Sequence, residues 1–154
     1  IHIGLAVAAE DGLRVPVIPD ADRLGLVELS SEIRRRVEEA RRGWLDLSVR
    51  STFTVSSLGM FGAERFLPII NPPECALLGA GAVQPRPAAH GGRVEVRRQM
   101  TLILACDHRA VDGVYAARLW RRCCVAGSKA PICPGLMGGC GSSTSMPTTT
   151  ALNG

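Results

Sequence analysis

The stretch MTLILACDHRAVDGVYAARLWRR (residues 100–122) predicts a strand, a polar turn and a helix in direct succession. Residues 100–106 are apolar except for Thr101, as suits a buried strand, and Asp112 is of a residue type that caps helix N-termini. The helix is expected to run from Val114 to about Arg122. Its inward-facing side chains are expected to be Ala117 and either Trp120 or Leu119.

The turn between the expected strand and helix carries His108. An imidazole titrates near neutral pH, so a histidine that is both anchored and exposed on a turn suits general-base work. The alternative is an ordinary turn histidine, with Asp112 serving only as the cap of the next helix. Arg109 is expected to pair with Asp112 or another acid. The residues alone leave both interpretations of His108 open.

A hairpin is expected near the start of the chain. Apolar residues alternate over residues 3–18, and Asp11-Gly12 lies between the two halves. This dipeptide favours a tight turn because glycine tolerates positive φ. Pro16 restricts the second strand to an edge or an irregular position. Further strands are expected at residues 52–56, 75–83 and 94–96, and a Pro- and Gly-rich loop at residues 84–92.

A long amphipathic helix is expected over residues 26–40, where apolar residues recur every three to four positions. Asp20 or Asp22 is the expected N-terminal cap, and Gly43 is the expected stop. Arginines and glutamates occupy the remaining positions of this helix. Mixed charges at helical spacing, without interleaved aromatic residues, indicate a solvated surface rather than a nucleic-acid site.

The composition fits one globular domain followed by a polar tail. The 154 residues are 46% apolar and 21% charged, with a formal net charge of +4. No apolar run is long enough to span a membrane. The six cysteines include no C-x-x-C pair, so reduced thiols in an intracellular setting are expected, and no metal. Residues 1–124 are expected to form the domain, and residues 125–154 a disordered, low-complexity tail.

Four motifs, in the right order and at plausible spacing, resemble the catalytic domain of dihydrolipoyl acyltransferases, the core enzymes of the 2-oxo acid dehydrogenase complexes. Residues 107–113 resemble the signature D-H-R-x-x-D-G of that family. Residues 3–18 look like its segments N-I-G-I-A-V and D-G-L-V-V-P-V-I. Residues 52–62 are similar to G-T-F-T-I-S-N-L-G-M-F-G, and residues 69–74 to I-I-N-P-P-Q. The resemblance covers about residues 1–120.

This resemblance implies a fold and a reaction. The fold would be α+β, a two-layer sandwich with a mixed sheet covered by helices, in an incomplete chloramphenicol-acetyltransferase-like domain. The reaction would move an acyl group, expected to be acetyl, between a dihydrolipoyl arm and coenzyme A. By resemblance His108 is the general base, Ser56 donates to the oxyanion, and Asp112 holds the local structure. In this family the serine and histidine of one site come from neighbouring subunits of a trimer.

The resemblance also implies substrates, partners and a location. Coenzyme A is a substrate, and the lipoyl group sits on a domain that this chain lacks. The expected partners are further copies, in trimers and larger cores, and the decarboxylase and dihydrolipoyl dehydrogenase components. Neither nucleic acid nor a membrane is expected as a partner. The expected location is the mitochondrial matrix or the bacterial cytoplasm, with a plastid as a further option.

Some features depart from the family pattern. The chain starts within an expected strand and without Met, so we expect a fragment that lacks the first half of the catalytic domain. Arg50-Ser51 stands where the family usually has Gly-Gly, which permits conformations that arginine resists. The alternative function is therefore a non-catalytic scaffold subunit or an inactive fragment. Retention of His108 and Asp112 argues against a scaffold, since a purely structural homologue could lose both.

Overall fold

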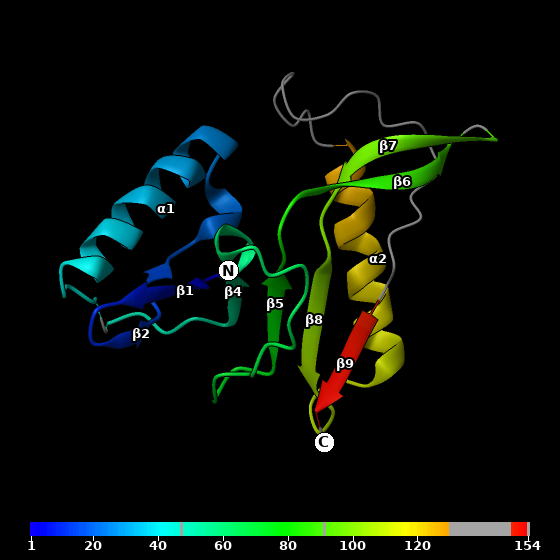
Figure 1. Cartoon of the computed structure of the whole chain (residues 1–154). Coiled ribbons are helices and arrows are strands. Elements are labelled where there is room, and N and C mark those ends of the chain that lie inside the picture. The colour runs from blue at the N-terminus through cyan, green and yellow to red at the C-terminus, as the bar shows by residue number, and fades with distance from the viewer. Residues whose placement is uncertain (47, 91, 130–148, 154) are drawn as a thin grey trace.

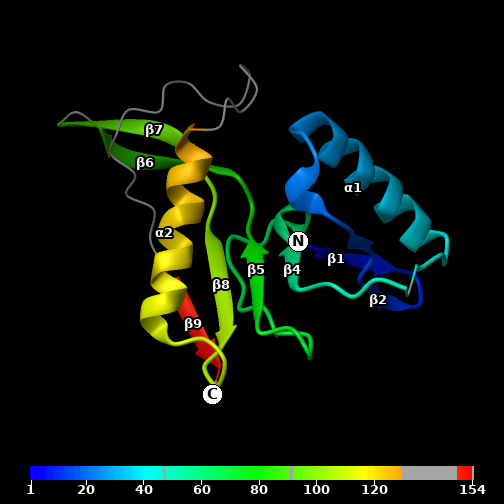
Figure 2. The ribbon, with the colours of Figure 1, turned by 180° about the vertical axis from the view of Figure 1, so that it is seen from behind.

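A mixed β-sheet forms the centre of the molecule, and a helix lies against each of its two halves (Figures 1 and 2). The computed structural model describes residues 1–46, 48–90, 92–129 and 149–153. Seven strands make up the sheet, in the order β2-β1-β4-β5-β8-β9, with β3 also paired to β1. Their bounds are β1 Ile3–Ala9, β2 Gly12–Arg14, β3 Val17–Ile18, β4 Phe53–Ser57, β5 Ala76–Ala80, β8 Leu102–Asp107 and β9 Thr149–Asn153. The expected α+β fold with a mixed sheet is confirmed.

Strand directions fix which residues share a row of the sheet. β1, β4 and β5 run parallel to one another, and β8 runs antiparallel to β5. One row contains Ala6, Ser56, Gly79 and Ile103. The C-terminal end of β8 therefore lies at the N-terminal ends of β4 and β5, far from the row that contains Ser56.

The predicted hairpin at the start of the chain is confirmed. β1 and β2 pair antiparallel with Ala9 opposite Gly12, and Gly12 has a φ of 131°. This conformation favours glycine over residues with a side chain. β2 ends before Pro16, and β3 resumes pairing with the start of β1 at Val17. The chain thus interrupts its ladder at the proline, as the sequence predicts.

The helix α1 (Leu26–Arg41) matches the predicted range and packs on β1 and β3. The prediction of Asp20 or Asp22 as its cap is wrong, because Asp20 is the N-cap residue of a short 3-10 helix at Ala21–Arg23 and Asp22 lies within that helix. Gly25 occupies the cap position, and Glu28 Oε2 accepts its backbone N–H at 2.9 Å. The predicted stop is confirmed: Gly43, with a φ of 95°, donates its N–H to the Ala40 carbonyl.

A second, two-stranded sheet replaces the loop predicted at residues 84–92. β6 (Gln84–His90) pairs antiparallel with β7 (Arg93–Gln99), and the pair extends away from the main sheet (Figure 1). Pro85 and Pro87 suggested a loop, but both belong to β6. In a two-stranded sheet each strand has one edge without a partner strand among the described residues, and proline is tolerated at such an edge.

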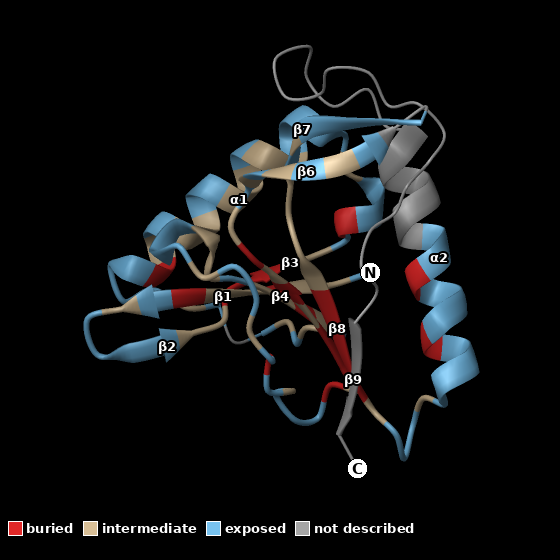
Figure 3. Cartoon of the chain, turned by 45° about the vertical axis from the view of Figure 1, so that its right-hand side comes forward, coloured by how far each residue is buried: buried red, intermediate tan, exposed pale blue. Residues whose placement is uncertain are grey.

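The helix α2 (Gly113–Lys129) packs on β8 and closes the main core. Of the α2 residues up to Arg122, whose burial is described, Ala116 and Trp120 are buried, so the prediction of Ala117 was wrong by one position and that of Trp120 was right. They pack with Ala76, Leu104 and Cys106, and Figure 3 shows the buried residues on the central strands and on one side of α2. Burial raises the pKa of the Cys106 thiol, which acts here as a small apolar side chain.

The predicted irregular tail differs from the structure at both of its ends. Residues 125–129 continue α2, and Thr149–Asn153 form β9, which pairs parallel with β8. The edge of β8 offers unpaired backbone groups, and these recruit a strand even from a polar segment. Residues 130–148 and 154 lie outside the described residues.

Candidate active site

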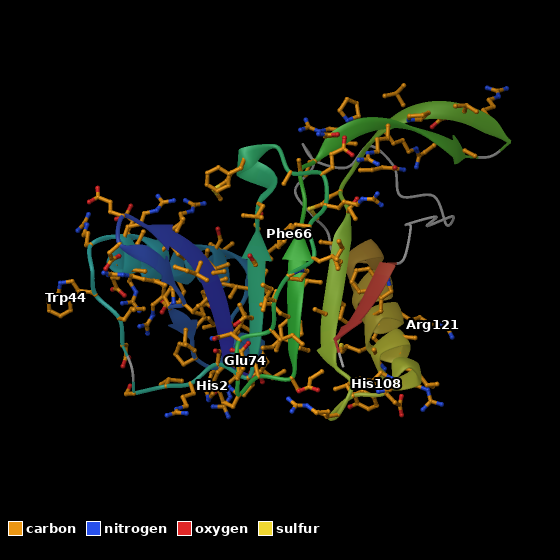
Figure 4. All side chains as sticks on the ribbon, turned by 60° about the horizontal axis from the view of Figure 1, so that its bottom comes forward. His2, Trp44, Phe66, Glu74, His108 and Arg121 are labelled. Carbon is orange, nitrogen blue, oxygen red and sulfur yellow. The ribbon has the colours of Figure 1, made fainter. Side chains whose placement is uncertain are left out.

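The turn that carries His108 is closed by backbone N–H groups that donate to the Asp107 carbonyl. The Asp107 N–H donates to the Cys75 carbonyl at 2.8 Å, which makes Asp107 the last anchored residue of β8. Its own carbonyl accepts the N–H groups of Ala110 at 3.0 Å and Val111 at 2.9 Å. His108 is exposed on this turn, between the end of β8 and the start of α2 (Figure 4). The expected combination of an anchored backbone and an exposed imidazole is therefore present.

An ion pair between Asp107 and Arg109 brackets the histidine in the sequence. Arg109 Nη2 donates to Asp107 Oδ2 at 2.7 Å, and Nε donates to Oδ1 at 3.0 Å. The backbone N–H of Arg109 also donates to Oδ1 at 3.0 Å. The side-chain bonds, followed by the backbone bond and the guanidinium charge, lower the pKa of Asp107 to about 2. The acid that Arg109 was expected to find is thus Asp107, and Asp112 serves another purpose.

Asp112 caps α2, as predicted. Its Oδ1 accepts the backbone N–H of Tyr115 at 2.6 Å, and its carbonyl accepts that of Ala116 at 3.0 Å. These bonds satisfy donors at the N-terminus of the helix. Asp112 therefore fixes the far end of the His108 turn, while Asp107 fixes the near end.

Ser56 lies within β4, half-buried, between Ala6 of β1 and Gly79 of β5. The register places Ile103 of β8 in the same row, four residues before Asp107. With about 3.3 Å per residue along a strand and about 4.8 Å between strands, Ser56 and the His108 turn are roughly 16 Å apart. The structure does not bring Ser56 and His108 together within one chain.

The replacement of the usual Gly-Gly pair by Arg50-Ser51 leaves the start of β4 intact. Asp20 is the only non-glycine residue with positive φ in the described part of the chain, so neither Arg50 nor Ser51 needs a glycine conformation. Ser51 instead donates its hydroxyl to Glu74 Oε1. The concern that this substitution distorts the strand carrying Ser56 is not supported by the geometry.

A buried polar cluster around Glu74 joins residues that are far apart in the sequence. Glu74 is 8% exposed and Thr54 is 1% exposed, and Thr54 Oγ1 donates to Glu74 Oε1 at 2.9 Å. Gly4 faces the cluster from β1, where an added Cβ would lie 2.5 Å from Thr54 Oγ1. The sequence offered one weak signal, a carboxylate placed directly between two prolines and an apolar strand.

A cavity of about 400 Å³ lies between the loop at residues 69–74, which contains Pro72 and Pro73, and the His108 turn. Its wall combines apolar side chains with three charged ones: Ile69, Ile70, Pro72, Pro73, Glu74, Asp107 and Arg109. Because Asp107 and Arg109 flank His108 in the chain, the cavity lies beside the turn that carries the imidazole.

The described residues contain no cluster of three or more His, Cys, Asp or Glu side chains that could hold a metal ion. None of the described helices is long and apolar enough to cross a bilayer.

Comparison with known proteins gives a family and several relatives. Residues 1–124 match the family model of the 2-oxoacid dehydrogenases acyltransferase catalytic domain. The acetyltransferase component of an acetoin cleaving system from Bacillus subtilis is 44% identical over 119 residues, covering 76% of this chain and 30% of that protein. A succinyltransferase component of the 2-oxoglutarate dehydrogenase complex from Rickettsia felis is 40% identical over 113 residues, covering 72% of this chain and 28% of that protein.

Solved structures show the same fold. The dihydrolipoamide acetyltransferase of Azotobacter vinelandii superposes with a TM-score of 0.72 at 39% identity, covering 80% of this chain and 51% of that chain. The cubic core of a pyruvate dehydrogenase multienzyme complex gives a TM-score of 0.71 at 39% identity, covering 79% and 51%. The chain therefore spans about half of these solved chains and less than a third of the curated relatives. The motifs, the fold and the match over residues 1–124 together show that the chain belongs to the acyltransferase family of the 2-oxoacid dehydrogenases.

Proposed function

We propose that the protein acts as a dihydrolipoyl acyltransferase, moving an acetyl group between a dihydrolipoyl arm and coenzyme A. One observation carries the proposal. In the Azotobacter vinelandii enzyme a serine, a histidine and an asparagine were investigated for their role in catalysis, and they are separated by 52 and 4 positions. Ser56, His108 and Asp112 have the same two separations here. An aspartate replaces the asparagine, and it keeps the oxygen that caps α2.

The roles of the residues follow from the chemistry of thiol–thioester exchange. His108 takes the proton of the attacking thiol, and it later returns this proton to the departing thiolate, so that proton and charge balance. Ser56 donates its hydroxyl hydrogen bond to the carbonyl oxygen while that oxygen carries the negative charge. Asp112 is a positioning residue that fixes the turn through its helix cap. Each role requires only side chains that the described structure contains.

The distance between Ser56 and His108 supports a site shared by two copies. A base and an oxyanion donor that act on one carbonyl must lie within hydrogen-bonding reach of it. The roughly 16 Å between Ser56 and the His108 turn is too long for the two side chains of one chain to meet at one carbonyl, which supports this proposal. We infer that Ser56 of one copy works with His108 of another. The relative that forms a cubic core supports such self-association.

The acyl group and the wider setting are part of the same proposal. We propose acetyl because the Bacillus subtilis relative is an acetyltransferase and is slightly more similar than the Rickettsia felis succinyltransferase. The arm would be carried by a lipoyl domain, and the partners would be the decarboxylase and dihydrolipoyl dehydrogenase components. Both of these relatives are bacterial, which favours the bacterial cytoplasm over the mitochondrial matrix.

A scaffold subunit without catalysis is the second candidate. The chain covers about half of the solved catalytic chains. A domain of this kind could join a core formed by intact subunits and contribute only contacts. The retained spacing of Ser56, His108 and Asp112 speaks against this alternative.

The deciding experiment is an acetyl-transfer assay from acetyl-coenzyme A to dihydrolipoamide, with the protein in its assembled state. We expect turnover that His108→Ala removes and that His90→Ala leaves intact. His90 is a suitable control because it ends β6, in the ribbon that extends from the main sheet. Absence of turnover in an assembled wild-type core would favour the scaffold.

A further inference from the structure

The residues on either side of His108 carry opposite charges and form an ion pair with each other. The Asp107 carboxylate accepts three N–H groups of Arg109: the backbone N–H, Nε and Nη2. The side chain of Asp107 is 21% exposed and that of Arg109 is 85% exposed. An ion pair with so exposed an arginine adds little to the free energy of unfolding. Its effect is therefore sought in the local structure of the His108 turn.

The pair has two consequences for the turn. The backbone N–H of Arg109 on Oδ1 closes a small loop around His108, and the two N–H groups on the Asp107 carbonyl close the next one. In addition, the negative and positive charges adjacent to the imidazole cancel. An unpaired carboxylate beside a histidine favours the protonated ring, and an unpaired guanidinium favours the neutral ring. A general base must be neutral before it acts and cationic afterwards, so either imbalance would hinder one half of the cycle.

We propose that Asp107 and Arg109 are positioning residues for His108: their ion pair closes the turn that holds the imidazole and keeps the net charge beside it at zero. The inference rests on the proposed function only in giving His108 the role of base. Its two parts are separable, because the backbone bond to Oδ1 depends on an acceptor at position 107, whereas the charge balance depends on both side chains.

The test is an NMR titration of the His108 ring in the 154-residue chain, comparing wild type with three variants that remove one or both of the charges. In Arg109→Gln the carboxylate stays and the guanidinium goes, so the midpoint of the His108 titration should rise. In Asp107→Asn the guanidinium stays and the carboxylate charge goes, so the midpoint should fall. Each shift should be roughly 0.3 to 0.5 pH units, the effect of a unit charge roughly 8 Å away in water. The double variant Asp107→Asn/Arg109→Gln should return to the wild-type midpoint.

The other ionisable groups near the turn stay constant across these proteins. Asp112 caps α2, and Glu74 lines the cavity that Asp107 and Arg109 also line. A uniform shift would therefore reflect a general rearrangement, whereas opposite shifts that cancel in the double variant isolate the ion pair. Equal midpoints in all four proteins, or shifts of the same sign in the two single variants, would overturn the charge balance.

The positioning of the turn is tested with Asp107→Ala, which also removes the acceptor for the Arg109 N–H. In the assembled protein, kcat for acetyl transfer should fall roughly 10- to 100-fold with KM changed less than about twofold. Asp107→Asn, which keeps an acceptor oxygen, should recover most of this loss. A wild-type kcat in Asp107→Ala, with His108→Ala inactive, would overturn the positioning role. Inactivity of the wild type would count against the proposed function instead, and the titration would still decide the inference.

Discussion

Ser56 lies roughly 16 Å from Asp107, the residue directly before His108, along the strand direction and across two strands of one β-sheet. Ser56 shares a row with Ile103, whereas His108 follows the last residue of β8. The separation is set by strand register, which cannot slip without exposing the core face of β8. A shared site between two copies is the arrangement that reconciles this rigid separation with one reaction.

The first prediction follows from this geometry and concerns mixed assemblies. His108→Ala and Ser56→Ala proteins should each be inactive alone but regain activity when dissociated and reassembled together. If a trimer forms at random from equal amounts, about one quarter of its sites combine an intact serine with an intact histidine. Acetyl transfer should therefore recover to about one quarter of the wild-type rate. The doubly substituted protein mixed with wild type is the control, because it shows whether the chains of two mixed proteins enter common trimers. Failure to recover, with mixed trimers verified by mass spectrometry, would contradict the shared site.

The second prediction concerns the size of each catalytic effect. His108→Ala should lower kcat by roughly 10² to 10⁴, the usual contribution of a positioned base. Ser56→Ala should lower kcat by roughly 10² with little change in KM, because its hydrogen bond strengthens as charge develops on the oxygen. Ser57→Ala is the matched control, since Ser57 is the next residue of β4 and is exposed. Steady-state kinetics on assembled proteins check both values. An equal effect of Ser57→Ala would remove the special role of Ser56.

Elements with strong local signals were predictable from the sequence. The hairpin follows from Asp11-Gly12, and α1 follows from apolar residues at helical spacing. The N-cap of α1 was not predicted, because Gly25 has no side chain that could accept a backbone N–H. The hydrogen bond at this cap instead runs from the Gly25 N–H to the Glu28 carboxylate. The strand β6 was missed because Pro85 normally weakens a strand, and only the two-stranded context makes it harmless.

The candidate site was predictable in part, for a physical reason. His108 and Asp112 lie four residues apart on one turn, so their neighbourhood is encoded locally. Glu74 meets Ser51 and Thr54 across 23 and 20 positions, and only the sheet register brings them together. The distance between Ser56 and His108 is likewise a property of the register. No local pattern could have supplied either relationship.

The third prediction concerns pH. The pKa of Asp107 is about 2, below its ordinary value of 3.8, chiefly because of the Arg109 side chain. A carboxyl whose pKa is lower in the folded state stabilises that state above its unfolded pKa, and this contribution is lost as the pH falls towards 2. The Arg109 amide should therefore keep its hydrogen-bonded chemical shift down to about pH 3 and lose it near pH 2. In Asp107→Asn this transition should be missing. A transition centred near pH 4 in the wild type would show that the pair is not formed.

The last prediction concerns the polar cluster behind the site. In Glu74→Ala the Thr54 hydroxyl, which is 1% exposed, loses its acceptor, so the free energy of unfolding should fall by about 1 to 3 kcal/mol. Gly4→Ala should cost a similar amount, because the added Cβ would lie 2.5 Å from Thr54 Oγ1 and 2.9 Å from Val15 Cγ1. Urea unfolding measures both changes. Ser57→Ala is the control, since Ser57 is exposed on the same strand as Thr54.

A double-mutant cycle separates the cluster from a general loss of packing. Thr54→Ala removes the oxygen that Gly4→Ala would meet, so the cost of Gly4→Ala should be smaller in that background. The residual cost should reflect the remaining contacts with Val15 and with Ser51 Oγ, which the added Cβ would approach to 3.0 Å. If the two costs simply add, Gly4 and Thr54 do not approach each other as closely as the structure places them. If they couple, the glycine at position 4 is required because a hydroxyl that holds Glu74 occupies the space of its side chain.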